Sequence, residues 1–193
     1  MIKAFFVGVI LTILAAAACT YVILAKGVIA AGADAGPMPA ERWAARLSLH
    51  ATLANDAPKT PNPVPLNDAN LIAGIKLYGR HCAICHGTAA GEASASPVAK
   101  GEYPRPPQLG AHGVEDDPEG VTYWKIDHGI RWTGMPAWKA TLSDQQMWTL
   151  ALFLKNMNKL SPAAEQAWQA VTNEPASPMP TPAAPPSPGS PNS

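Results

Sequence analysis

The pentapeptide Cys82-Ala83-Ile84-Cys85-His86 carries the most specific signal in this chain of 193 residues. Two cysteines three residues apart on a helical turn point to the same side, and a histidine follows directly. C-x-x-C-H is the attachment sequence of haem c, in which the thiols form thioethers with the vinyl groups and the histidine binds the iron. We therefore predict one covalent haem c, bound through Cys82 and Cys85, with His86 as an iron ligand.

Two other uses of a C-x-x-C pair fit this sequence less well. A thioredoxin-like redox pair requires a β-α-β setting, and no run of alternating apolar and polar residues is found. A zinc site requires further ligands, and neither a second C-x-x-C nor a closely spaced histidine pair follows. The pattern thus favours haem.

A second iron ligand is predicted in the segment Thr133-Gly134-Met135-Pro136, which lies 49 residues after His86. Gly134 permits close approach of the backbone, and Pro136 fixes its own φ angle. Together these residues can hold a thioether at one position. Met135 is therefore the predicted axial ligand opposite His86.

Other side chains are weaker candidates for this position. Met147 and Met157 fall on an apolar helical pattern, where methionine usually fills the core. His112 and His128 are alternative ligands. An iron with an open sixth site is the remaining possibility.

Residues 4–25 carry no charged side chain and are rich in Phe, Val, Ile, Leu and Ala. At 1.5 Å per residue the run is about 33 Å long, enough to cross a hydrocarbon core of about 30 Å. We predict a transmembrane anchor over residues 1–26, with Cys19 as an apolar filler. The alternatives are a cleaved signal peptide, a lipoprotein signal cut before Cys19, and a buried core helix. Flanking charges do not orient the run.

Residues 27–66 are predicted to link the anchor to a folded domain. Within them, residues 40–53 have the spacing of a short helix, with Trp43 and Leu47 on one face. Trp43 is expected either at the membrane interface or against the folded domain. Four prolines between residues 58 and 65 predict a stiff, extended spacer.

Residues 67–161 are predicted to form an all-α domain with three main helices. Residues 87–116 are rich in Gly, Pro and Ala and are expected to be a long loop around the cofactor. The predicted N-terminal capping residues of the helices are Asn67 or Asp68, Asp117 before Pro118, and Ser143 in a capping box with Gln146.

Residues 162–193 are predicted to contain a short helix and then a disordered, proline-rich tail. Eight of the twenty residues from 174 to 193 are proline. Such a segment cannot bury enough apolar surface to offset the entropy of ordering it.

The charge balance excludes several classes of protein. With 14 Lys+Arg and 14 Asp+Glu the net charge is zero, whereas nucleic-acid binding normally requires a basic stripe. Residues 66–161 alone carry nine basic and nine acidic residues, so strong electrostatic steering of a redox partner is not expected. The sequence contains no nucleophile–base pair, phosphate loop or paired carboxylates. We therefore predict neither enzymatic activity nor a small-molecule substrate.

Residues 68–158 resemble class I c-type cytochromes, in particular the membrane-anchored bacterial monohaem type that is similar to the cytochrome domains of cbb3-type oxidase subunits. Four motifs carry the resemblance. They are Gly74-x-x-x-Tyr78-x-x-x-Cys82-x-x-Cys85-His86, Pro107-Gln108-Leu109, Gly134-Met135-Pro136 and Trp148-Thr149-Leu150-Ala151-Leu152-Phe153-Leu154-Lys155.

The resemblance implies the class I cytochrome c fold, in which three main helices and a long loop surround one haem. The first and last of these helices are expected to cross at Gly74, whose missing side chain admits Leu150 or Phe153. Leu109 is expected on the haem face. The carbonyl of Pro106 or Pro107 is expected to accept a hydrogen bond from Nδ1 of His86, and the candidate propionate partners are Tyr103, Arg105, Trp124 and Trp132.

The resemblance also implies a function. Iron with His86 and Met135 as ligands has no position for a substrate, so one-electron transfer at a raised potential is expected. Because haem c is attached outside the bacterial cytoplasm, the expected location is the inner membrane with the haem domain on the periplasmic side. The expected partners are the membrane and unidentified redox proteins of a respiratory chain. The alternatives are a subunit of a larger oxidase or dehydrogenase complex, and a haem-based gas or redox sensor.

Overall fold

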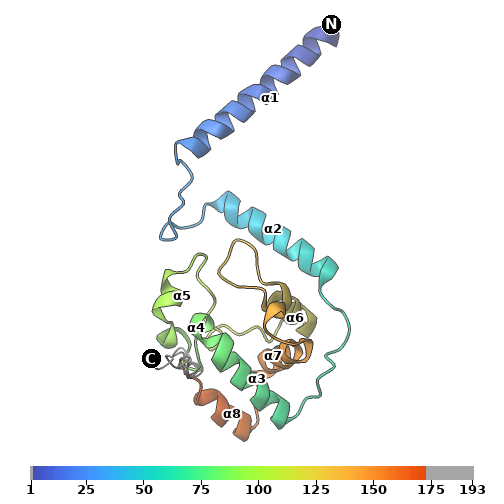
Figure 1. The fold of residues 1–193 in the computed structure, drawn as a ribbon, viewed down its shortest axis with the longest axis vertical. Helices are drawn as coiled ribbons and strands as arrows, with labels where there is room; N and C mark the ends of the chain where they lie inside the picture. Colours follow the sequence, from blue (N-terminus) through green and yellow to red (C-terminus); the bar gives the residue numbers. More distant parts are fainter. Residues whose placement is uncertain (1, 173–193) are drawn as a thin grey trace, which may run out of the picture. The chain divides into compact units, whose positions relative to one another are not determined.

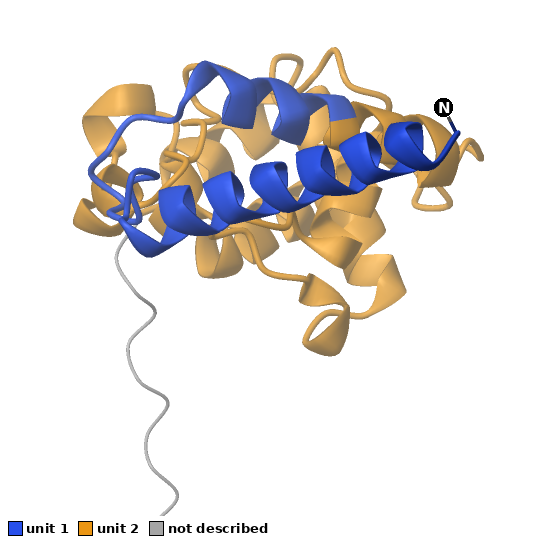
Figure 2. Ribbon diagram, turned by 90° about the horizontal axis from the view of Figure 1, so that it is seen from above, with its two compact units in different colours: residues 1–47 blue, residues 48–193 orange. Residues whose placement is uncertain are grey.

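The computed structural model describes residues 2–172, which form helices and loops without strands. The chain divides into two compact units, Met1–Leu47 and Ser48–Ser193 (Figure 1, Figure 2). The predicted all-α class is therefore confirmed, whereas the predicted disordered tail at 174–193 lies outside the described residues. The helices are α1 (Ile2–Ala25), α2 (Pro39–Asp56), α3 (Asp68–His81), α4 (Ala83–His86), η1 (Gly91–Ser94), α5 (Pro97–Gly101), α6 (Glu119–His128), η2 (Trp138–Ala140), α7 (Asp144–Asn156) and α8 (Pro162–Gln169).

Helix α1 belongs to the first unit and buries none of its side chains. Its mean hydropathy reaches 2.5, so by length and composition it can cross a membrane, a test that a signal sequence also passes. The hydroxyls of Thr12 and Thr20 donate to the carbonyls of Gly8 and Ala16, both at 2.9 Å. Both polar side chains are thus satisfied within the helix, as an apolar environment requires.

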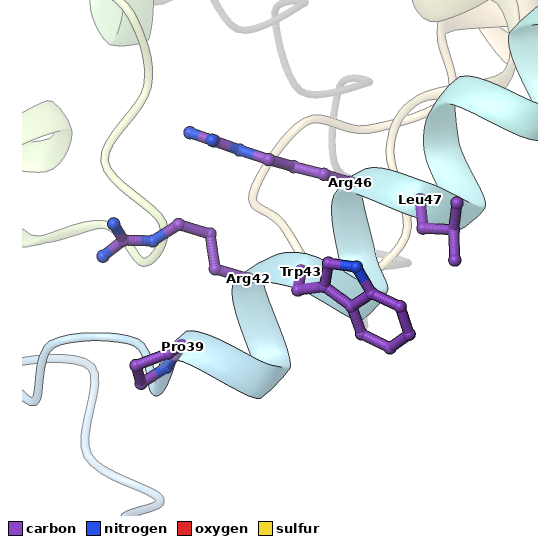
Figure 3. Close-up of a pocket in the computed structure, with 5 residues that line it drawn as sticks. All are labelled: Pro39, Arg42, Trp43, Arg46 and Leu47. Carbon is purple, nitrogen blue, oxygen red and sulfur yellow. The ribbon is translucent and has the colours of Figure 1, made fainter.

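The large apolar side chains of helix α2 are exposed near its beginning and buried near its end. Near its beginning Trp43 is 66% and Leu47 56% exposed. These two side chains lie one turn apart, while Arg42 and Arg46 project from another side of the helix (Figure 3). Near its end Leu53, a residue of the second unit, is buried. The predicted helix in this region is present and longer at both ends.

The centre of the second unit is the crossing of α3 and α7 at Gly74 (Figure 1). A Cβ atom on Gly74 would lie 2.6 Å from the carbonyl oxygen of Thr149 and 2.7 Å from Cβ of Phe153. The helices approach this closely because Gly74 has no side chain. The expected contact with Phe153 is confirmed, and Leu150, the alternative, is also fully buried.

Helix α8 completes this core, so the packed unit extends beyond the boundary predicted at residue 161. Trp168 is 5% exposed, and its ring lies 5.3 Å from the ring of Tyr78 and 5.2 Å from that of Phe153. Ser161 caps the helix and Pro162 occupies its first turn. Ser161 and Pro162 therefore define the beginning of α8, and Trp168 packs the helix against the core.

The proline-rich stretch at residues 58–65, predicted as a stiff, extended spacer, packs against other parts of the second unit. Val64 is buried. The Asn62 amide donates to Oε1 of Glu119 at 3.0 Å and to the carbonyl of Trp148 at 3.1 Å. The proline content predicted an extended backbone, but it did not reveal these polar contacts.

The helix starts follow the predicted caps with one correction. Asn67 caps α3, and Ser143 and Gln146 form the capping box of α7. Helix α6, however, has Pro118 rather than Asp117 as its N-cap. The Asp117 carboxylate instead accepts from Nζ of Lys125 at 2.7 Å, so it is not available to the N–H groups of the helix.

The loop predicted at residues 87–116 contains two short helices, η1 and α5. Ser96 is the N-cap of α5, since its hydroxyl accepts from the backbone N–H of Ala99 at 3.1 Å, and Pro97 follows it. The same hydroxyl donates to the carbonyl of Ile84 at 2.5 Å. Ser96 thereby ties the loop to the cysteine motif.

Candidate haem site

Cys82 joins α3 to α4, because it ends the first helix and caps the second. Its carbonyl accepts from the backbone N–H of His86 at 2.9 Å, so the motif lies on one helical turn. The buried hydroxyl of Tyr78 lies 3.1 Å from the carbonyl oxygen of His86 and 2.9 Å from that of Gly87. Gly87 ends the turn with φ 72°, which a glycine adopts without strain. Residues 82–87 are called the attachment turn below.

The surroundings of both thiols in the attachment turn favour the neutral form. Burial, with a smaller effect of Cys85, raises the pKa of Cys82 to about 12. Burial also raises the pKa of Cys85, and the charge and hydrogen bond of Glu102 raise it further. A redox-active pair requires a lowered pKa. The raised pKa values of these cysteines therefore disfavour thiol–disulfide exchange.

Nδ1 of His86 lies 2.9 Å from the carbonyl oxygen of Pro107, one of the two expected acceptors. This hydrogen bond requires the proton on Nδ1 and leaves Nε2 as the metal-binding nitrogen. Burial lowers the pKa of His86, against the opposing effects of the Pro107 carbonyl and the Glu102 carboxylate. The imidazole is therefore neutral at pH 7 and fixed in direction.

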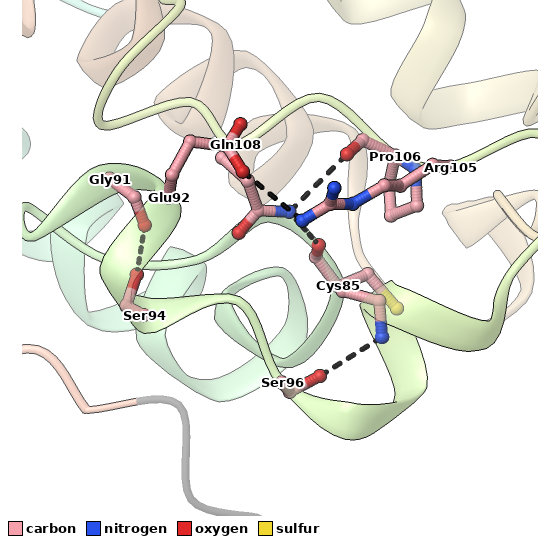
Figure 4. A network of polar contacts seen from close by, with 9 residues as sticks. Cys85, Gly91, Glu92, Ser94, Ser96, Arg105, Pro106 and Gln108 are labelled. Atoms are coloured by element: carbon pink, nitrogen blue, oxygen red, sulfur yellow. Dashed lines mark hydrogen bonds and ion pairs between the residues drawn. The ribbon is translucent and has the colours of Figure 1, made fainter.

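The segment that carries this acceptor is bound to the attachment turn at two further points. The backbone N–H of Leu109 donates to the carbonyl of His86 at 2.9 Å. Nε2 of Gln108 donates to the carbonyl of Cys85 at 2.9 Å and lies 3.3 Å from the carbonyl oxygen of Pro106 (Figure 4). Leu109 is 7% exposed and forms part of the core.

Met135 lies in a loop between α6 and η2, residues 129–136, called the methionine loop below. Its carbonyl accepts from the backbone N–H of Ile130 at 3.2 Å, and its own N–H donates to Oγ1 of Thr133 at 3.1 Å. Gly129 has φ 65°, and a Cβ there would lie 2.6 Å from the carbonyl oxygen of Met135. The Met135 side chain packs partly buried against the core. The loop thus fixes the methionine backbone on both sides.

Glu102 lies next to both the attachment turn and the methionine loop. Its carboxylate forms a hydrogen bond with the Cys85 thiol, and the same carboxylate fills the space that a Cβ on Gly134 would occupy. Because Gly134 directly precedes Met135, the thiol and the methionine loop share one neighbour. The sequence analysis missed Glu102, since an isolated acid in a loop rich in Gly and Ala forms no motif.

The rival ligands are placed differently. His128 stacks on Trp124 with ring centroids 4.5 Å apart. His112 is exposed. Met147 and Met157 are 3% and 8% exposed and lie in the core, in line with their helical spacing. Met135 is therefore the candidate second ligand that lies beside the cysteine motif.

Two of the candidate propionate partners, Arg105 and Trp132, are exposed. Arg105 forms an exposed ion pair with Glu92 at 3.1 Å (Figure 4), and Trp132 is 87% exposed. Their role toward a propionate stays a prediction.

The donor set fits a covalently bound haem c. It consists of two neutral thiols on one turn, a neutral imidazole with its Nδ1 proton held by a carbonyl, and a partly buried thioether. Together with the all-helical domain and the crossing of α3 and α7, this set defines a class I c-type cytochrome.

The family model for cytochrome c oxidase, cbb3-type, subunit III matches residues 69–154. The match supports a class I c-type cytochrome domain of the cbb3 type over these residues. That family implies a covalently bound haem c and an electron-carrying role.

Two further comparisons add context. A chain of the Kuenenia stuttgartiensis reducing HAO-like protein complex is 22% identical, with a TM-score of 0.41. The match covers 52% of this chain and 50% of that one, so this chain spans about half of its length. Comparison with curated proteins gives no match.

Proposed function

We propose that this protein transfers single electrons through one haem c that is attached to Cys82 and Cys85 and ligated by His86 and Met135. One observation carries the proposal. A neutral, oriented imidazole lies on the same turn as the two thiols, and the methionine loop shares a carboxylate neighbour with that turn.

The side chains of the site have separate tasks. Each thiol supplies the sulfur and hydrogen that add across one vinyl group, so both reactants are consumed and nothing is released. When bound, the haem supplies an iron that gains and loses one electron. His86 keeps its Nδ1 proton on the Pro107 carbonyl, and the neutral thioether of Met135 favours Fe(II) and raises the potential. Two protein ligands leave no position for a substrate.

We further propose that α1 anchors the protein in the bacterial cytoplasmic membrane, with the haem domain on the periplasmic side, as part of a respiratory chain. The apolar helix and the family relationship support this location. Residues 66–161 carry no net charge, so long-range steering of a partner is weak. Anchoring raises the effective concentration of membrane-bound donors and acceptors instead.

Absorption spectroscopy of the purified full chain tests the ligation. We expect a low-spin reduced spectrum that carbon monoxide does not change, because the thioether occupies the sixth position. Met135→Ala is expected to bind carbon monoxide. Met38→Ala, which changes an exposed methionine outside the haem domain, is the control and is expected to behave like the wild type. Ready binding by the wild type would contradict the ligation and favour a sensor.

Purification from native membranes tests the location and the partners. We expect the protein in the membrane fraction, and we expect deletion of residues 2–25 to release it in soluble form. Elution alone supports a free-standing carrier, whereas co-elution with catalytic subunits supports a subunit of a larger oxidoreductase. A wild-type protein that is soluble without detergent would contradict the anchor.

A further inference from the structure

We propose that Gln108 is a positioning residue for the iron ligand His86. Its side-chain amide holds the Pro107 carbonyl where that carbonyl accepts the Nδ1 proton. This inference rests on the proposed ligation by His86.

The hydrogen bond in question joins His86 and Pro107. The side-chain amide of Gln108 contacts the residue that precedes each of them. Nε2 donates to the carbonyl of Cys85 at 2.9 Å and lies 3.3 Å from the carbonyl oxygen of Pro106 (Figure 4). Cys85 directly precedes His86, and Pro106 directly precedes Pro107. The Gln108 side chain is 1% exposed, so water does not compete for these contacts.

The direction of the amide is determined by its neighbours. Two carbonyl oxygens face one end, and only the NH₂ group can satisfy them. The opposite atom, Oε1, is buried and has no hydrogen-bond partner among the described residues. It lies 2.5 Å from the position of a Cβ on Gly87, so the glycine makes room for it. Among the described residues, the Gln108 side chain therefore forms hydrogen bonds only by donating to these two carbonyls.

The main chain of Gln108 is held by residues that follow it in the sequence. Its carbonyl accepts from the N–H groups of Ala111 at 3.0 Å and His112 at 2.9 Å. With the side chain bound to Cys85 and the carbonyl bound downstream, the peptide between Pro107 and Gln108 cannot rotate without breaking one set of bonds. Without the amide, the bond from the Leu109 N–H to the His86 carbonyl is the one that remains of the two further bonds between this segment and the attachment turn, so the Pro107 carbonyl can shift away from the imidazole.

This movement has a consequence at the iron ligand. A hydrogen bond from Nδ1 makes the imidazole a stronger base and stabilises Fe(III). Weakening it makes His86 a poorer donor to iron, raises the reduction potential, and exposes the Nδ1 proton to exchange with solvent.

Ser96 provides a matched control. Ser96 is 5% exposed, and its hydroxyl donates to the carbonyl of Ile84 at 2.5 Å, on the same attachment turn. Neither Pro106 nor Pro107 takes part in its hydrogen bonds. Ser96→Ala thus removes a buried hydrogen bond of the same turn without loosening the acceptor of His86.

The test uses the haem-loaded full chain in the reduced, diamagnetic state. NMR measures exchange of the His86 Nδ1 proton, and potentiometry measures the reduction potential. In Gln108→Met, which keeps the length of the side chain and lacks its donor, we expect exchange to be faster by about tenfold or more and the potential to be higher. In Ser96→Ala we expect both to match the wild type, although both variants unfold more easily.

Three results would overturn the inference. They are unchanged exchange and potential in Gln108→Met, equal changes in Ser96→Ala, or a lower potential in Gln108→Met. Should Gln108→Met fail to retain haem, Gln108→Asn, which shortens the amide, is measured by the same criteria. Covalent haem is assayed first in the wild type. Its absence would contradict the proposed function, whereas normal haem with unchanged exchange would contradict the role of Gln108 alone.

Discussion

The attachment turn and the methionine loop each present one predicted iron ligand, but they are held in different ways. Tyr78 and Gln108, which are 0% and 1% exposed, reach the attachment turn from other elements of the domain. The hydrogen bonds around Met135 come instead from Thr133 and Ile130, within the methionine loop itself, and four of the eight residues of that loop are exposed. One ligand lies on a turn that is held by residues outside it, and the other lies on a loop that is held by its own hydrogen bonds.

This difference separates folding from ligation. Opening a buried, cross-linked turn requires much of the domain to unfold, whereas a loop closed by its own bonds can open locally. We therefore expect changes at the attachment turn to affect the stability of the whole domain. Changes at the methionine loop are expected to affect access to the iron more than stability.

The largest effect is expected when both attachment thiols are removed. The Cys82→Ala/Cys85→Ala variant cannot hold the haem, whose apolar face supplements a core that is marginal for a domain of this size. We expect loss of the cooperative thermal transition in circular dichroism. Cys19→Ser, a change in α1, is the control and is expected to melt like the wild type. A cooperative, native-like melt of the double variant would contradict this prediction.

A pair of glycines compares the two regions directly. Gly87 and Gly129 have φ 72° and 65°, where an alanine costs about 1–3 kcal/mol. We expect Gly87→Ala to lower the free energy of unfolding by this amount, because its Cβ would displace the buried Gln108 amide. Gly129→Ala is expected to lower it at least as much, because its Cβ would lie 2.6 Å from backbone atoms of Met135 and Pro136. It is also expected to admit carbon monoxide, because those backbone atoms position the Met135 side chain. Denaturant titration and carbon monoxide binding measure the two effects.

Gly101→Ala is the control for this pair, because nothing lies within 4 Å of a Cβ there. It is expected to change neither the stability beyond about 0.5 kcal/mol nor the binding of carbon monoxide. Equal carbon monoxide binding by Gly87→Ala and Gly129→Ala would remove the distinction between the two regions.

A smaller effect is expected from Thr133→Val. The Thr133 hydroxyl accepts from the Met135 N–H at 3.1 Å and donates to the Ile130 carbonyl at 2.7 Å. Losing about 1 kcal/mol of local hydrogen bonding raises the open population of the loop about fivefold. We expect carbon monoxide to bind the reduced protein faster by a similar factor in stopped-flow measurements. Thr141→Val removes a hydroxyl bonded to the Trp138 carbonyl, outside the loop, and serves as the control.

The smallest effect concerns pH. Burial, with a smaller effect of the Arg80 charge, lowers the pKa of His81 in the folded chain below the usual 6.5. Between this lowered value and 6.5 the unfolded chain binds more protons, so the contribution to stability is complete above 6.5 and falls as the pH is lowered through this window. Denaturant titrations from pH 7.5 to pH 5 are expected to show this decline, with a shallower slope in His81→Gln. Stability that rises toward pH 5 would contradict it.

Much of the fold could be predicted because it depends on local signals. The Ser143–Gln146 capping box, the small residue Gly74 at the helix crossing and the C-x-x-C-H spacing are all readable in the chain, and the structure contains each of them. These features act through neighbouring residues or through the absence of a side chain.

The remainder depends on contacts between distant residues. Asp117 was predicted to cap α6, but Lys125 takes its carboxylate. The acid Glu102 and the amide of Gln108 reach the site from a loop in which composition indicated only irregular structure. No local pattern reports such pairings, because their partners come together only when the core forms.

The central claim is that the sulfur of Met135 occupies the sixth position on the iron. Proton NMR of the reduced full chain tests it most directly, because the methyl group of a methionine over a haem is shifted strongly upfield by the ring current. We predict one such methyl resonance in the wild type and in Met38→Ala, and its loss in Met135→Ala. Absence of the resonance in the wild type, or its persistence in Met135→Ala, would contradict the account.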